Sequence, residues 1–377
     1  MEQPVVLAAV RTPLGKRNGA LAEIHPATLL GYAQRGALEA AGLDPAEVGQ
    51  VVGGCVTQVG EQSYNITRTA WLAAGLPEQV AGSTVDAQCG SAQQALTLAS
   101  ALVGSGTVDI AMACGVEAMS RVPIGANYRK EFQLGRPVPK QYLERYEFTN
   151  QFVAAERMAV KWGVTRADAD GFGLLSQQRA AQAWEQDRFA GQIVPVGDVA
   201  RDGALRESTL EGLAGLKTVV EGGVHTAGTS SQISDGASAV IVASARRATE
   251  LGIKPLARIV DSCLVGVDPV MMLTGPIAAT PLLLQRNNLT MADIDHVEIN
   301  EAFASVVLSW ARECDADLAK VNPNGGAIAL GHPLGATGCV LATKAIHELQ
   351  RTQGRYALVT MCCGGGLGTG TLLERQP

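Results

Sequence analysis

This sequence has few aromatic side chains and no excess of basic residues, and both features disfavour the same class of function. Only 4% of the 377 residues are Phe, Trp or Tyr, and the net charge is −6 with 47% hydrophobic residues. Binding to nucleic acid needs a basic face and often aromatic stacking platforms, so that class is disfavoured. A chain of this size and apolar content is instead expected to be a soluble globular protein with a large buried core and two or three domains.

Cysteine is present without the spacing that metals or disulfide scaffolds require. The eight cysteines form no CxxC pair, and no HxxxH pattern accompanies them. We therefore expect no metal site and a reducing, cytoplasmic environment. The start Met-Glu-Gln-Pro does not resemble a signal peptide, and no apolar run reaches the roughly 20 residues that span a bilayer, so no membrane association is expected.

The sequence repeats itself at long range. Residues 43–53 are similar to residues 289–299, the turn at Cys89 corresponds to the turn at His332, and residues 112–115 correspond to 361–364. The three matches share a nearly constant shift of about 245 residues, which is far longer than a solenoid repeat and indicates two homologous domains.

Within each half, short apolar strands alternate with helices of small residues. Residues 110–114 and 356–361 are predicted strands, and the alternation predicts an α/β fold with a mostly parallel sheet covered on both faces. Between residues 118 and 229 the composition becomes richer in Tyr, Phe, Arg, Lys and Gln, with a charged helix expected at 166–184. This stretch is interpreted as an inserted loop domain that could cover a ligand.

Cys89 is the most informative single residue. It ends an apolar strand, turns at Gly90 and precedes a helix of small residues. At a helix N-terminus the unpaired backbone N–H groups and the macrodipole favour the thiolate, and the same N–H groups could hold an oxyanion. Buried apolar packing is the simpler interpretation for the other lone cysteines, namely Cys55, Cys114, Cys263, Cys314 and Cys339.

His332 occupies the repeat position that matches Cys89. It lies between Gly331 and Pro333 on a turn that leads into a helix, so the duplication predicts that the two residues meet as a nucleophile and its base. The alternative is a turn histidine satisfied by local backbone. The other histidines lack a companion acid, a metal-ligand spacing or a glycine turn, and a structural role is expected for His25, His225, His296 and His347.

Cys362 precedes three glycines at the end of an apolar strand. Backbone N–H groups at glycines can approach a ligand oxygen closely, and a thiol near them suits proton transfer at the carbon α to a thioester. The alternative is a tight turn with an incidental core cysteine. The segment 364–370 does not fit GxGxxG, which argues against a dinucleotide-binding dehydrogenase.

Asn300 and Glu301 follow a predicted strand at 297–299. The amide of Asn300 could hold a water against a carbonyl oxygen while Glu301 orients its neighbours, although a plain helix N-cap is the alternative for Asn300. The hydroxyl-rich segment 226–236 is suited to a pantetheine amide or thioester, or it is only a polar loop.

Taken together and in this order, these segments resemble the thiolase family. The motifs are Cys89-Gly90-Ser91, Asn300-Glu301-Ala302-Phe303-Ala304, residues 324–338 with Gly331-His332-Pro333, and Met361-Cys362 followed by the glycines 364–366. The resemblance spans nearly the whole chain. It implies duplicated βαβαβαββ halves that form a five-layered α-β-α-β-α core. The implied division is 1–117, completed by about 232–254, then an inserted loop domain at 118–231 covering the coenzyme A site, then 255–377.

The resemblance also implies a role for each residue. Cys89 becomes acylated, His332 activates it, Asn300 holds a water in one oxyanion site, and Cys362 moves the α-proton. Backbone N–H groups of Cys89 and Gly364 form the second oxyanion site, and Ser231 approaches the coenzyme A thioester. The implied reaction is thiolytic cleavage of a 3-ketoacyl-CoA to acetyl-CoA or propionyl-CoA and a shortened acyl-CoA, reversible as Claisen condensation. Coenzyme A acts as a co-substrate with no tightly bound cofactor or metal, in a dimer or tetramer.

Departures from the common thiolase pattern concern the substrate rather than the chemistry. Thr229-Ser230-Ser231-Gln232 and Cys363 are unusual, as is Asn150 at the start of a loop-domain helix, and the segments 53–58, 225–232 and 306–310 look like actinobacterial thiolases of steroid breakdown. The alternatives are a biosynthetic acetoacetyl-CoA thiolase and a non-catalytic lipid- or acyl-CoA-binding relative. A ketoacyl synthase shares the architecture but would carry His or Asn where Cys362 stands.

Overall fold

The first half of the chain alternates strands and helices and is interrupted before its last strand. The computed structural model describes residues 2–129, 131, 133 and 135–376. Its first elements are β1 (Pro4–Arg11), β2 (Gly15–Lys16), α1 (Pro26–Ala41), β3 (Gln50–Gly54), α2 (Ile66–Ala73), β4 (Ala81–Val85), α3 (Ser91–Gly104) and β5 (Ile110–Ala118). The closing strand β6 (Ser234–Ser244) comes only after a long insertion, and the short helix α8 (Ala245–Leu251) follows it.

The second half repeats this order with one strand reduced. Its elements are β7 (Ala257–Gly266), α9 (Gly275–Arg286), β8 (His296–Ile299), α10 (Ala304–Cys314), α11 (Ala327–Leu330), α12 (Thr337–Thr352), β9 (Tyr356–Cys363) and β10 (Leu367–Arg375). Where β4 would have its counterpart, the chain makes only an isolated parallel bridge between Val297 and Val321. Both halves therefore follow the predicted βαβαβαββ pattern, with the third strand of the second half shortened to a single bridge.

The strands join into one sheet of order β4-β3-β5-β6-β1-β7-β10-β9-β8. The prediction of a mostly parallel sheet is wrong. Only β3 with β4, β3 with β5, and β8 with β9 pair in parallel, and the other strand pairs are antiparallel. The reason is that each half closes with two adjacent antiparallel strands, and β1 and β7 pair antiparallel at Val5 with Arg258 and at Val6 with Ala257.

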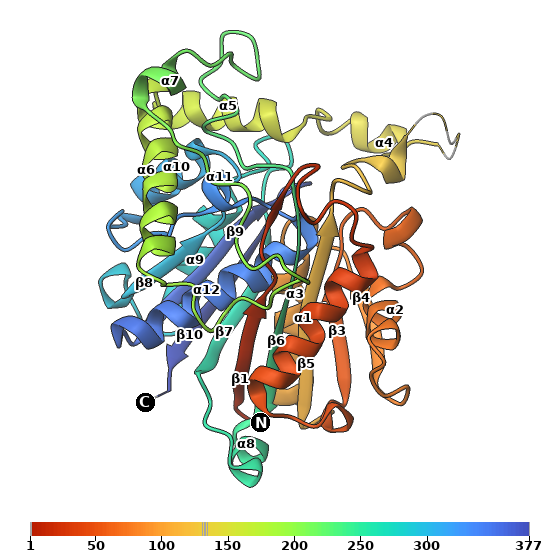
Figure 1. The fold of residues 1–377 in the computed structure, drawn as a ribbon. Coiled ribbons are helices and arrows are strands. Elements are labelled where there is room, and N and C mark those ends of the chain that lie inside the picture. The colour runs from red at the N-terminus through yellow and green to blue at the C-terminus, as the bar shows by residue number, and fades with distance from the viewer. Residues whose placement is uncertain (1, 130, 132, 134, 377) are drawn as a thin grey trace.

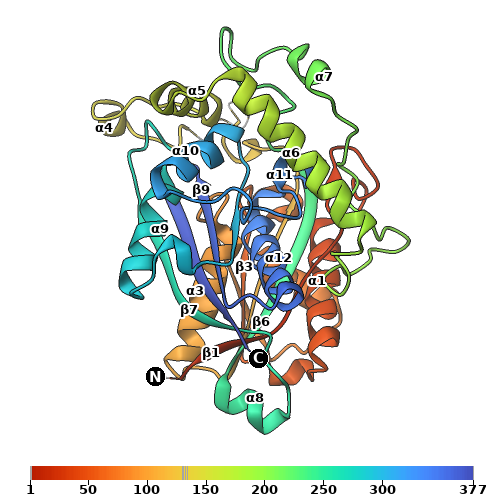
Figure 2. The ribbon, with the colours of Figure 1, turned by 90° about the vertical axis from the view of Figure 1, so that its left-hand side faces the viewer.

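Helices and sheet alternate in five layers, and three large apolar clusters lie between these layers. The first packs α1 and α2 on the sheet of the first half and contains Leu30 and Met112. The second lies between the first-half and second-half parts of the sheet and contains Leu96 of α3 and Leu341 of α12. The third packs α9 and α10 on the far side and contains Trp310 and Leu358. Figures 1 and 2 show α3 and α12 between the two half-sheets, with α1 on one outer face and α9 on the other.

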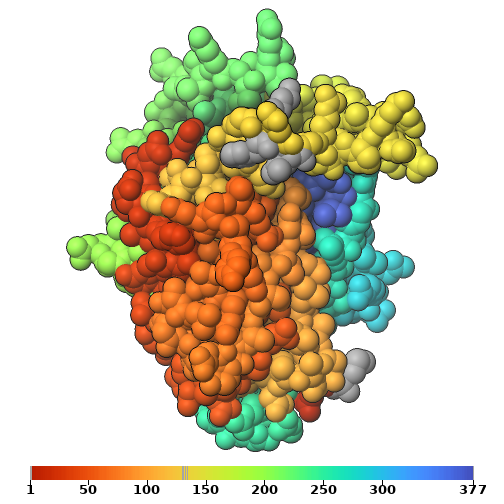
Figure 3. All heavy atoms as spheres, turned by 90° about the vertical axis from the view of Figure 1, so that its right-hand side faces the viewer, coloured from red at the N-terminus to blue at the C-terminus, as the bar shows by residue number. Residues whose placement is uncertain are grey.

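The insertion between β5 and β6 is helical and lies over one end of the sheets. It contains α4 (Lys140–Leu143), α5 (Gln151–Trp162), α6 (Arg166–Glu185) and α7 (Leu210–Ala214). Helix α6 confirms the charged helix predicted at 166–184, and Figure 3 shows the yellow and green insertion along the upper edge of the molecule. The residue bounds of the three-part division stay a prediction. No helix within the described ranges is long and apolar enough to cross a membrane.

Candidate active site

The N-terminal turns of α3 and α12 touch at the centre of the molecule. A side-chain carbon added at Gly338 would lie 2.1 Å from the backbone nitrogen of Gln93, so only glycine fits there. One residue along, the Cys339 thiol donates to the carbonyl of Ala92 over 3.3 Å. This contact brings the segments that precede the two helices, which carry Cys89 and His332, to the same place, as the duplication predicted.

Cys89 sits on a strained turn between β4 and α3. Gln88 adopts a left-handed conformation with φ +54°, and Ser91, the first residue of α3, donates to the Gln88 carbonyl and accepts from Ala87. Non-glycine residues with positive φ are uncommon and need surrounding support. The turn holds the Cys89 thiol partly exposed beside an apolar cluster of Val56, Met119 and Leu334.

The expectation of a resting thiolate at Cys89 is wrong for this structure. Loss of solvent raises the pKa of the thiol to about 11, and the backbone N–H groups of Gly364 and of Cys89 itself, which lower the pKa, offset only part of that effect. The negative charges of Glu117 and Asp86 add to the increase. Burial thus outweighs the helix terminus, so Cys89 rests as a thiol and needs a base when it attacks.

His332 is held in a single tautomer. Its Nδ1 lies 2.6 Å from the Thr337 hydroxyl, which itself donates to the Pro333 carbonyl over 2.8 Å. Since that hydroxyl has only one proton to give, Nδ1–H must be the donor and Nε2 carries the free lone pair. Burial lowers the pKa of His332 to about 4, so the imidazole is neutral and can accept a proton at Nε2.

Asn300 lies directly against His332. Its side-chain nitrogen is 3.3 Å from His332 Nε2, and its side-chain oxygen is buried with no hydrogen-bond partner among the described residues. The helix-cap alternative is excluded, because α10 begins at Ala304 with Phe303 as its N-cap. A buried amide oxygen needs a donor, which a bound water or substrate group could supply.

The strand end at β9 brings Cys362 and Gly364 to Cys89. Burial, together with the nearby Cys89, raises the pKa of the Cys362 thiol. Cys362 packs with Phe303 and Met272 in one apolar cluster, whereas Cys363 joins the central cluster. The Gly364 N–H points at the Cys89 sulfur. Cys89 is thus within reach of a second thiol and a backbone donor.

Glu301 organises the segment that leads to His332, as expected. The buried carboxylate accepts from the Ser176 hydroxyl at 2.6 Å, the Asn322 amide at 3.0 Å and the Ile328 N–H at 3.1 Å. Burial raises the pKa of this carboxyl, while these donors lower it. Ser176 belongs to α6, so the insertion is tied to the catalytic segment through Glu301.

Ser231 lies beside the Asn300 segment. Its N–H donates to the Ala302 carbonyl over 2.9 Å, and its neighbour Ser230 forms a bridge with Phe303. Ser231 is half-buried. Its contact with coenzyme A stays a prediction.

Two polar residues at the site were missed by the sequence analysis. Thr337 fixes the His332 tautomer, and Glu117 is a fully buried carboxylate near Cys89. The signal for Glu117 was available, because it is the one charged residue in the otherwise apolar strand β5. The signal for Thr337 was weaker, since a threonine at a helix start is commonplace.

Three of the other histidines have structural partners. His25 caps α1 by accepting from the Ala27 N–H, His347 bonds to the Ala9 carbonyl, and His225 bonds to Ser305. Within the described residues, no three His, Cys, Asp or Glu side chains are placed to hold a metal ion.

Comparison with known proteins assigns the whole chain to one family. Residues 4–246 match the family described as thiolase, N-terminal domain, and residues 253–375 match thiolase, C-terminal domain. The chain is 49% identical to a steroid 3-ketoacyl-CoA thiolase of Mycobacterium tuberculosis, with 100% of this chain and 95% of that protein covered. It is 40% identical to a 3-oxoadipyl-CoA/3-oxo-5,6-dehydrosuberyl-CoA thiolase of Escherichia coli, with both chains fully covered.

Solved structures agree with the sequence comparisons. Human mitochondrial 3-ketoacyl-CoA thiolase superposes with a TM-score of 0.91 at 32% identity, covering 100% of this chain and 99% of the other. The Bacillus anthracis acetyl-CoA acetyltransferase superposes with a TM-score of 0.92 at 34% identity and the same coverage. With two family domains matched in order and a full-length relative at 49% identity, this chain belongs to the thiolase family.

Proposed function

We propose that this protein is an acyltransferase that cleaves a 3-ketoacyl-CoA with coenzyme A through an acyl-cysteine at Cys89. The observation that carries the proposal is the meeting of the α3 and α12 turns, which follow a protonated Cys89 thiol and a neutral His332 whose Nε2 carries no proton. A thiol that rests protonated and a base held in one tautomer fit a reaction in which the nucleophile forms only on attack.

In the first half-reaction, Cys89 gives its proton to His332 Nε2 as its sulfur attacks the C3 carbonyl. The developing oxyanion accepts the N–H groups of Cys89 and Gly364, which already point at the Cys89 sulfur. The C2–C3 bond then breaks, and its electrons form the enolate of the leaving thioester. That enolate oxygen is stabilised by His332 and by a water bound to Asn300.

Cys362 completes the first half-reaction by protonating the enolate carbon. The raised pKa of its thiol means that Cys362 holds its proton at rest and is ready to act as the acid. Acetyl-CoA or propionyl-CoA leaves, and in the second half-reaction the coenzyme A thiol gives its proton to the Cys362 thiolate and attacks the Cys89 thioester. Release of the shortened acyl-CoA and return of the proton from His332 to Cys89 restore the enzyme.

The insertion is proposed to cover the coenzyme A. Arg206, on this insertion, is exposed, and no carboxylate lies within 4.0 Å of it among the described residues. Its guanidinium donates to the Ala227 carbonyl, on the segment that leads to Ser231. A cation left without an acidic partner is suited to a phosphate of coenzyme A, while Ser231 lies near the thioester end.

The proposed substrate is a 3-ketoacyl-CoA from steroid or lipid degradation. The support is the similarity to the mycobacterial steroid 3-ketoacyl-CoA thiolase, which is identical to this chain at 49% of positions. Acetyl-CoA acetyltransferases also match, at 38% identity for that of Syntrophomonas wolfei, so a biosynthetic acetoacetyl-CoA thiolase is the second candidate. In either case coenzyme A enters as a co-substrate in the cytoplasm, and purified protein is expected to carry no bound cofactor or metal.

The test is thiolysis of a panel of 3-ketoacyl-CoAs, from acetoacetyl-CoA to a bulky sterol-side-chain thioester. We expect turnover that is lost in Cys89→Ala and in Cys362→Ala and kept in the control Cys314→Ala, which lies outside the site. Intact mass spectrometry should show an acyl adduct that Cys89→Ala lacks. A folded protein without turnover on any thioester would instead favour a non-catalytic acyl-CoA-binding relative, and preference for acetoacetyl-CoA would favour the biosynthetic candidate.

A further inference from the structure

Glu117 is a buried carboxylate surrounded only by hydrogen-bond donors. It lies at the end of β5, is fully buried, and accepts from the N–H groups of Val56 and Thr57, both at 3.0 Å. Its other two partners are the Gln62 side-chain amide at 2.8 Å and the Gly335 N–H at 2.9 Å. Four donors occupy the four lone-pair positions of an ionised carboxylate. In the protonated form, the hydrogen of the carboxylic acid would point at the hydrogen of one of these donors.

The charge of Glu117 is not neutralised by a basic residue. No Lys, Arg or His lies within 4.0 Å of this carboxylate in the described part of the chain. Burial raises its pKa above the ordinary value, and the four hydrogen bonds, which favour the ionised form, offset part of that increase. A buried charge that is held by uncharged donors alone is costly to keep unless it serves a purpose at its position.

The four donors come from three segments that meet at the catalytic centre. Val56 and Thr57 follow β3, Gln62 ends a short 3-10 turn, and Gly335 lies three residues after His332. The turn at Gly335 packs without space for a side chain, since an added carbon would lie 2.6 Å from both the Cys55 backbone and the Val116 carbonyl. Val56 in turn contacts the apolar side of Cys89 together with Leu334.

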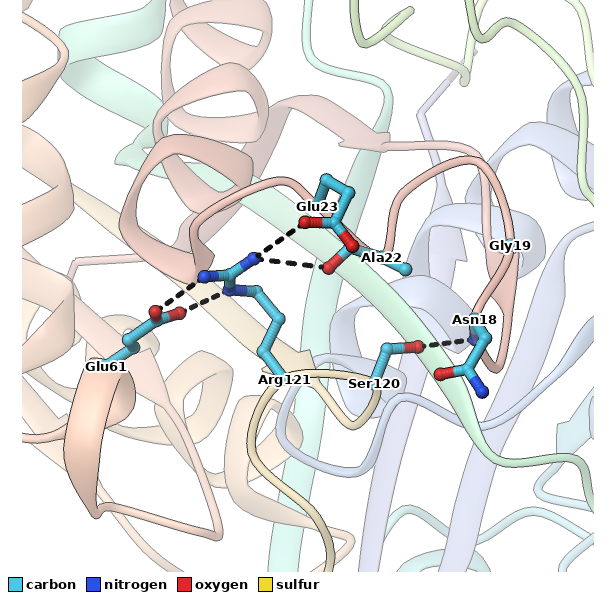
Figure 4. Close-up of a pocket in the computed structure, with 7 residues that line it drawn as sticks. All are labelled: Asn18, Gly19, Ala22, Glu23, Glu61, Ser120 and Arg121. Carbon is cyan, nitrogen blue, oxygen red and sulfur yellow. Dashed lines mark hydrogen bonds and ion pairs between the residues drawn. The ribbon is translucent and has the colours of Figure 1, made fainter.

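A second acidic residue anchors the same segment on its outer side. Glu61, next to Gln62, forms a two-point ion pair with Arg121, with 2.6 Å between Glu61 Oε1 and Arg121 Nη2. Figure 4 shows this pair at the rim of a cavity of about 430 Å³, where Arg121 also faces Glu23. None of the residues lining this cavity belongs to the catalytic cluster, so Glu61 offers a matched control for Glu117.

We propose that Glu117 is a positioning residue for the thiolase reaction, whose ionised carboxylate fixes the Gly335 turn, and through it His332, against the Val56 wall of Cys89. The proposal rests on the proposed function. It assigns Glu117 no contact with the reacting atoms. Glu117 links the first half of the chain by hydrogen bonds to the His332 turn of the second half. This link keeps the distance between the base His332 and the nucleophile Cys89 fixed.

The first experiment compares steady-state thiolysis by Glu117→Gln, Glu117→Asp and Glu61→Gln. In Glu117→Gln the amide nitrogen faces two of the four donors, and we expect kcat to fall by about 10- to 100-fold, because a base displaced by an ångström loses that much. The KM for coenzyme A should stay within about twofold, because Arg206 and Ser231 are untouched. Glu61→Gln should retain wild-type kcat.

The second experiment separates positioning from simple structural support. The charge on Glu117 contributes to the high pKa of Cys89, so its removal should move the pH profile of Cys89 alkylation by iodoacetamide toward lower pH. We expect Glu117→Gln to react at least about threefold faster below both midpoints, as a shift of half a pKa unit gives. Glu117→Asp keeps the charge and should keep the profile while losing kcat.

A folded Glu117→Gln with wild-type kcat, or an alkylation profile that coincides with wild type, overturns the proposal. If Glu117→Gln does not fold, Gln62→Leu removes one donor and leaves the carboxylate in place. An unchanged kcat in that variant then overturns the proposal, and a fall of at least about threefold at unchanged KM supports it. If the wild-type protein shows no thiolysis, the proposed function fails, but the alkylation profiles still test whether Glu117 acts on Cys89.

Discussion

At the scale of single residues, the chemistry depends on which atom of His332 is free. The Thr337 hydroxyl donates a hydrogen bond to the Pro333 carbonyl and accepts one from Nδ1. Nε2 is therefore the basic nitrogen, and it faces Asn300. Thr337 plays the part that a carboxylate or carbonyl plays for many catalytic histidines, since it fixes orientation and tautomer without adding a charge. The absence of that charge is consistent with the low pKa of about 4 at His332.

Replacing Thr337 with Val should therefore damage catalysis more than stability. The variant keeps the shape of the side chain but removes the acceptor for Nδ1–H, so the imidazole can rotate or change tautomer. We expect kcat for thiolysis to fall by roughly 10-fold or more, with the KM for coenzyme A little changed. The check is steady-state kinetics beside thermal unfolding.

Thr343→Val is the matched control for this prediction. Thr343 is equally buried and lies on the same helix, but its hydroxyl bonds only to the Val10 carbonyl at 3.5 Å. Equal losses of kcat in both variants would show that Thr337 has no specific role.

The residues of the site could be predicted in identity but not in protonation state. Cys89, His332 and Cys362 stand out because glycine turns and the internal repeat mark them. The structure places Cys362 near Cys89 and joins the helices that follow Cys89 and His332. The thiolate expectation failed because the amount of solvent lost around Cys89 is a property of the folded layers, which no local pattern contains. Glu117 is visible in the sequence as the one charged residue of β5, but its role was missed because its donors come from the distant positions 56, 57, 62 and 335.

At the scale of elements, two equivalent helices meet where the chemistry occurs. Helices α3 and α12 occupy the same place in the two halves, and both belong to the central apolar cluster. Their N-terminal turns approach closely because Gly338 has no side chain toward Gln93. The duplication thereby converts two distant turns of the sequence into one site.

Adding a single carbon at this contact should separate the two turns. In Gly338→Ala the new carbon would lie 2.1 Å from the Gln93 backbone nitrogen, which cannot move without shifting α3. We expect a loss of about 1–3 kcal/mol in the free energy of unfolding together with a fall in kcat. Chemical denaturation and thiolysis of the same preparation provide the measurement.

Gly171→Ala is the control for this prediction, because it also adds a carbon to a helical glycine but is expected to stabilise the protein. Gly171 is exposed within α6, and an added carbon there meets open space. Alanine should leave activity unchanged and stabilise the helix by about 0.5–1 kcal/mol. A destabilisation at Gly171 as large as that at Gly338 would mean that helix backbone effects, not the α3–α12 contact, explain the result.

The elements themselves were largely predictable, whereas their pairing was not. The strands expected at 110–114 and 356–361 appear as β5 and β9, with longer bounds than predicted. The direction of pairing was wrong because β6 and β10 close each half as antiparallel strands, and their order in the sheet depends on contacts far apart in sequence. The shortening of one strand to the Val321 bridge left no mark in the sequence.

At the scale of the whole molecule, buried neutral histidines couple folding to pH. Burial lowers the pKa of His225, His332 and His347, for His332 to about 4 from the ordinary 6.5. Between those values the unfolded chain binds protons that the folded chain does not. The contribution of these histidines to the free energy of unfolding is therefore complete above about pH 6.5, and it is lost as the pH drops toward 4.

We expect this loss to reach about 3 kcal/mol for His332 alone, since each pKa unit corresponds to about 1.4 kcal/mol. Urea unfolding at a series of pH values from 7.5 to 4 measures it. In His332→Asn the dependence on pH over this range should be shallower than in the wild-type chain. Equal slopes would show that other groups control the acid response.

An exposed aromatic arm indicates assembly beyond one chain. In the insertion, Tyr142 packs against Tyr146 at a tilt and against Phe148 edge-on. Tyr146 is 43% and Phe148 is 60% exposed, and the nearby Leu143 is 43% exposed. Figure 1 shows α4 projecting from the body of the molecule. A monomer gains little from ordering such a cluster in water, so a partner surface is expected to cover it.

We therefore expect a homo-oligomer at micromolar concentration, to which this arm contributes. Sedimentation velocity should give a dimer or tetramer for the wild-type chain, and a paired Tyr146→Ser and Phe148→Ser variant should sediment as a smaller species. Since neither residue touches Cys89 or His332, thiolysis per active site should persist in the variant if each chain carries a complete site. A wild-type monomer would contradict the expectation of assembly. A variant with unchanged size would place the contact elsewhere, with the open edge of β4 as the next surface to examine, because its backbone pairs on one side only within the described sheet.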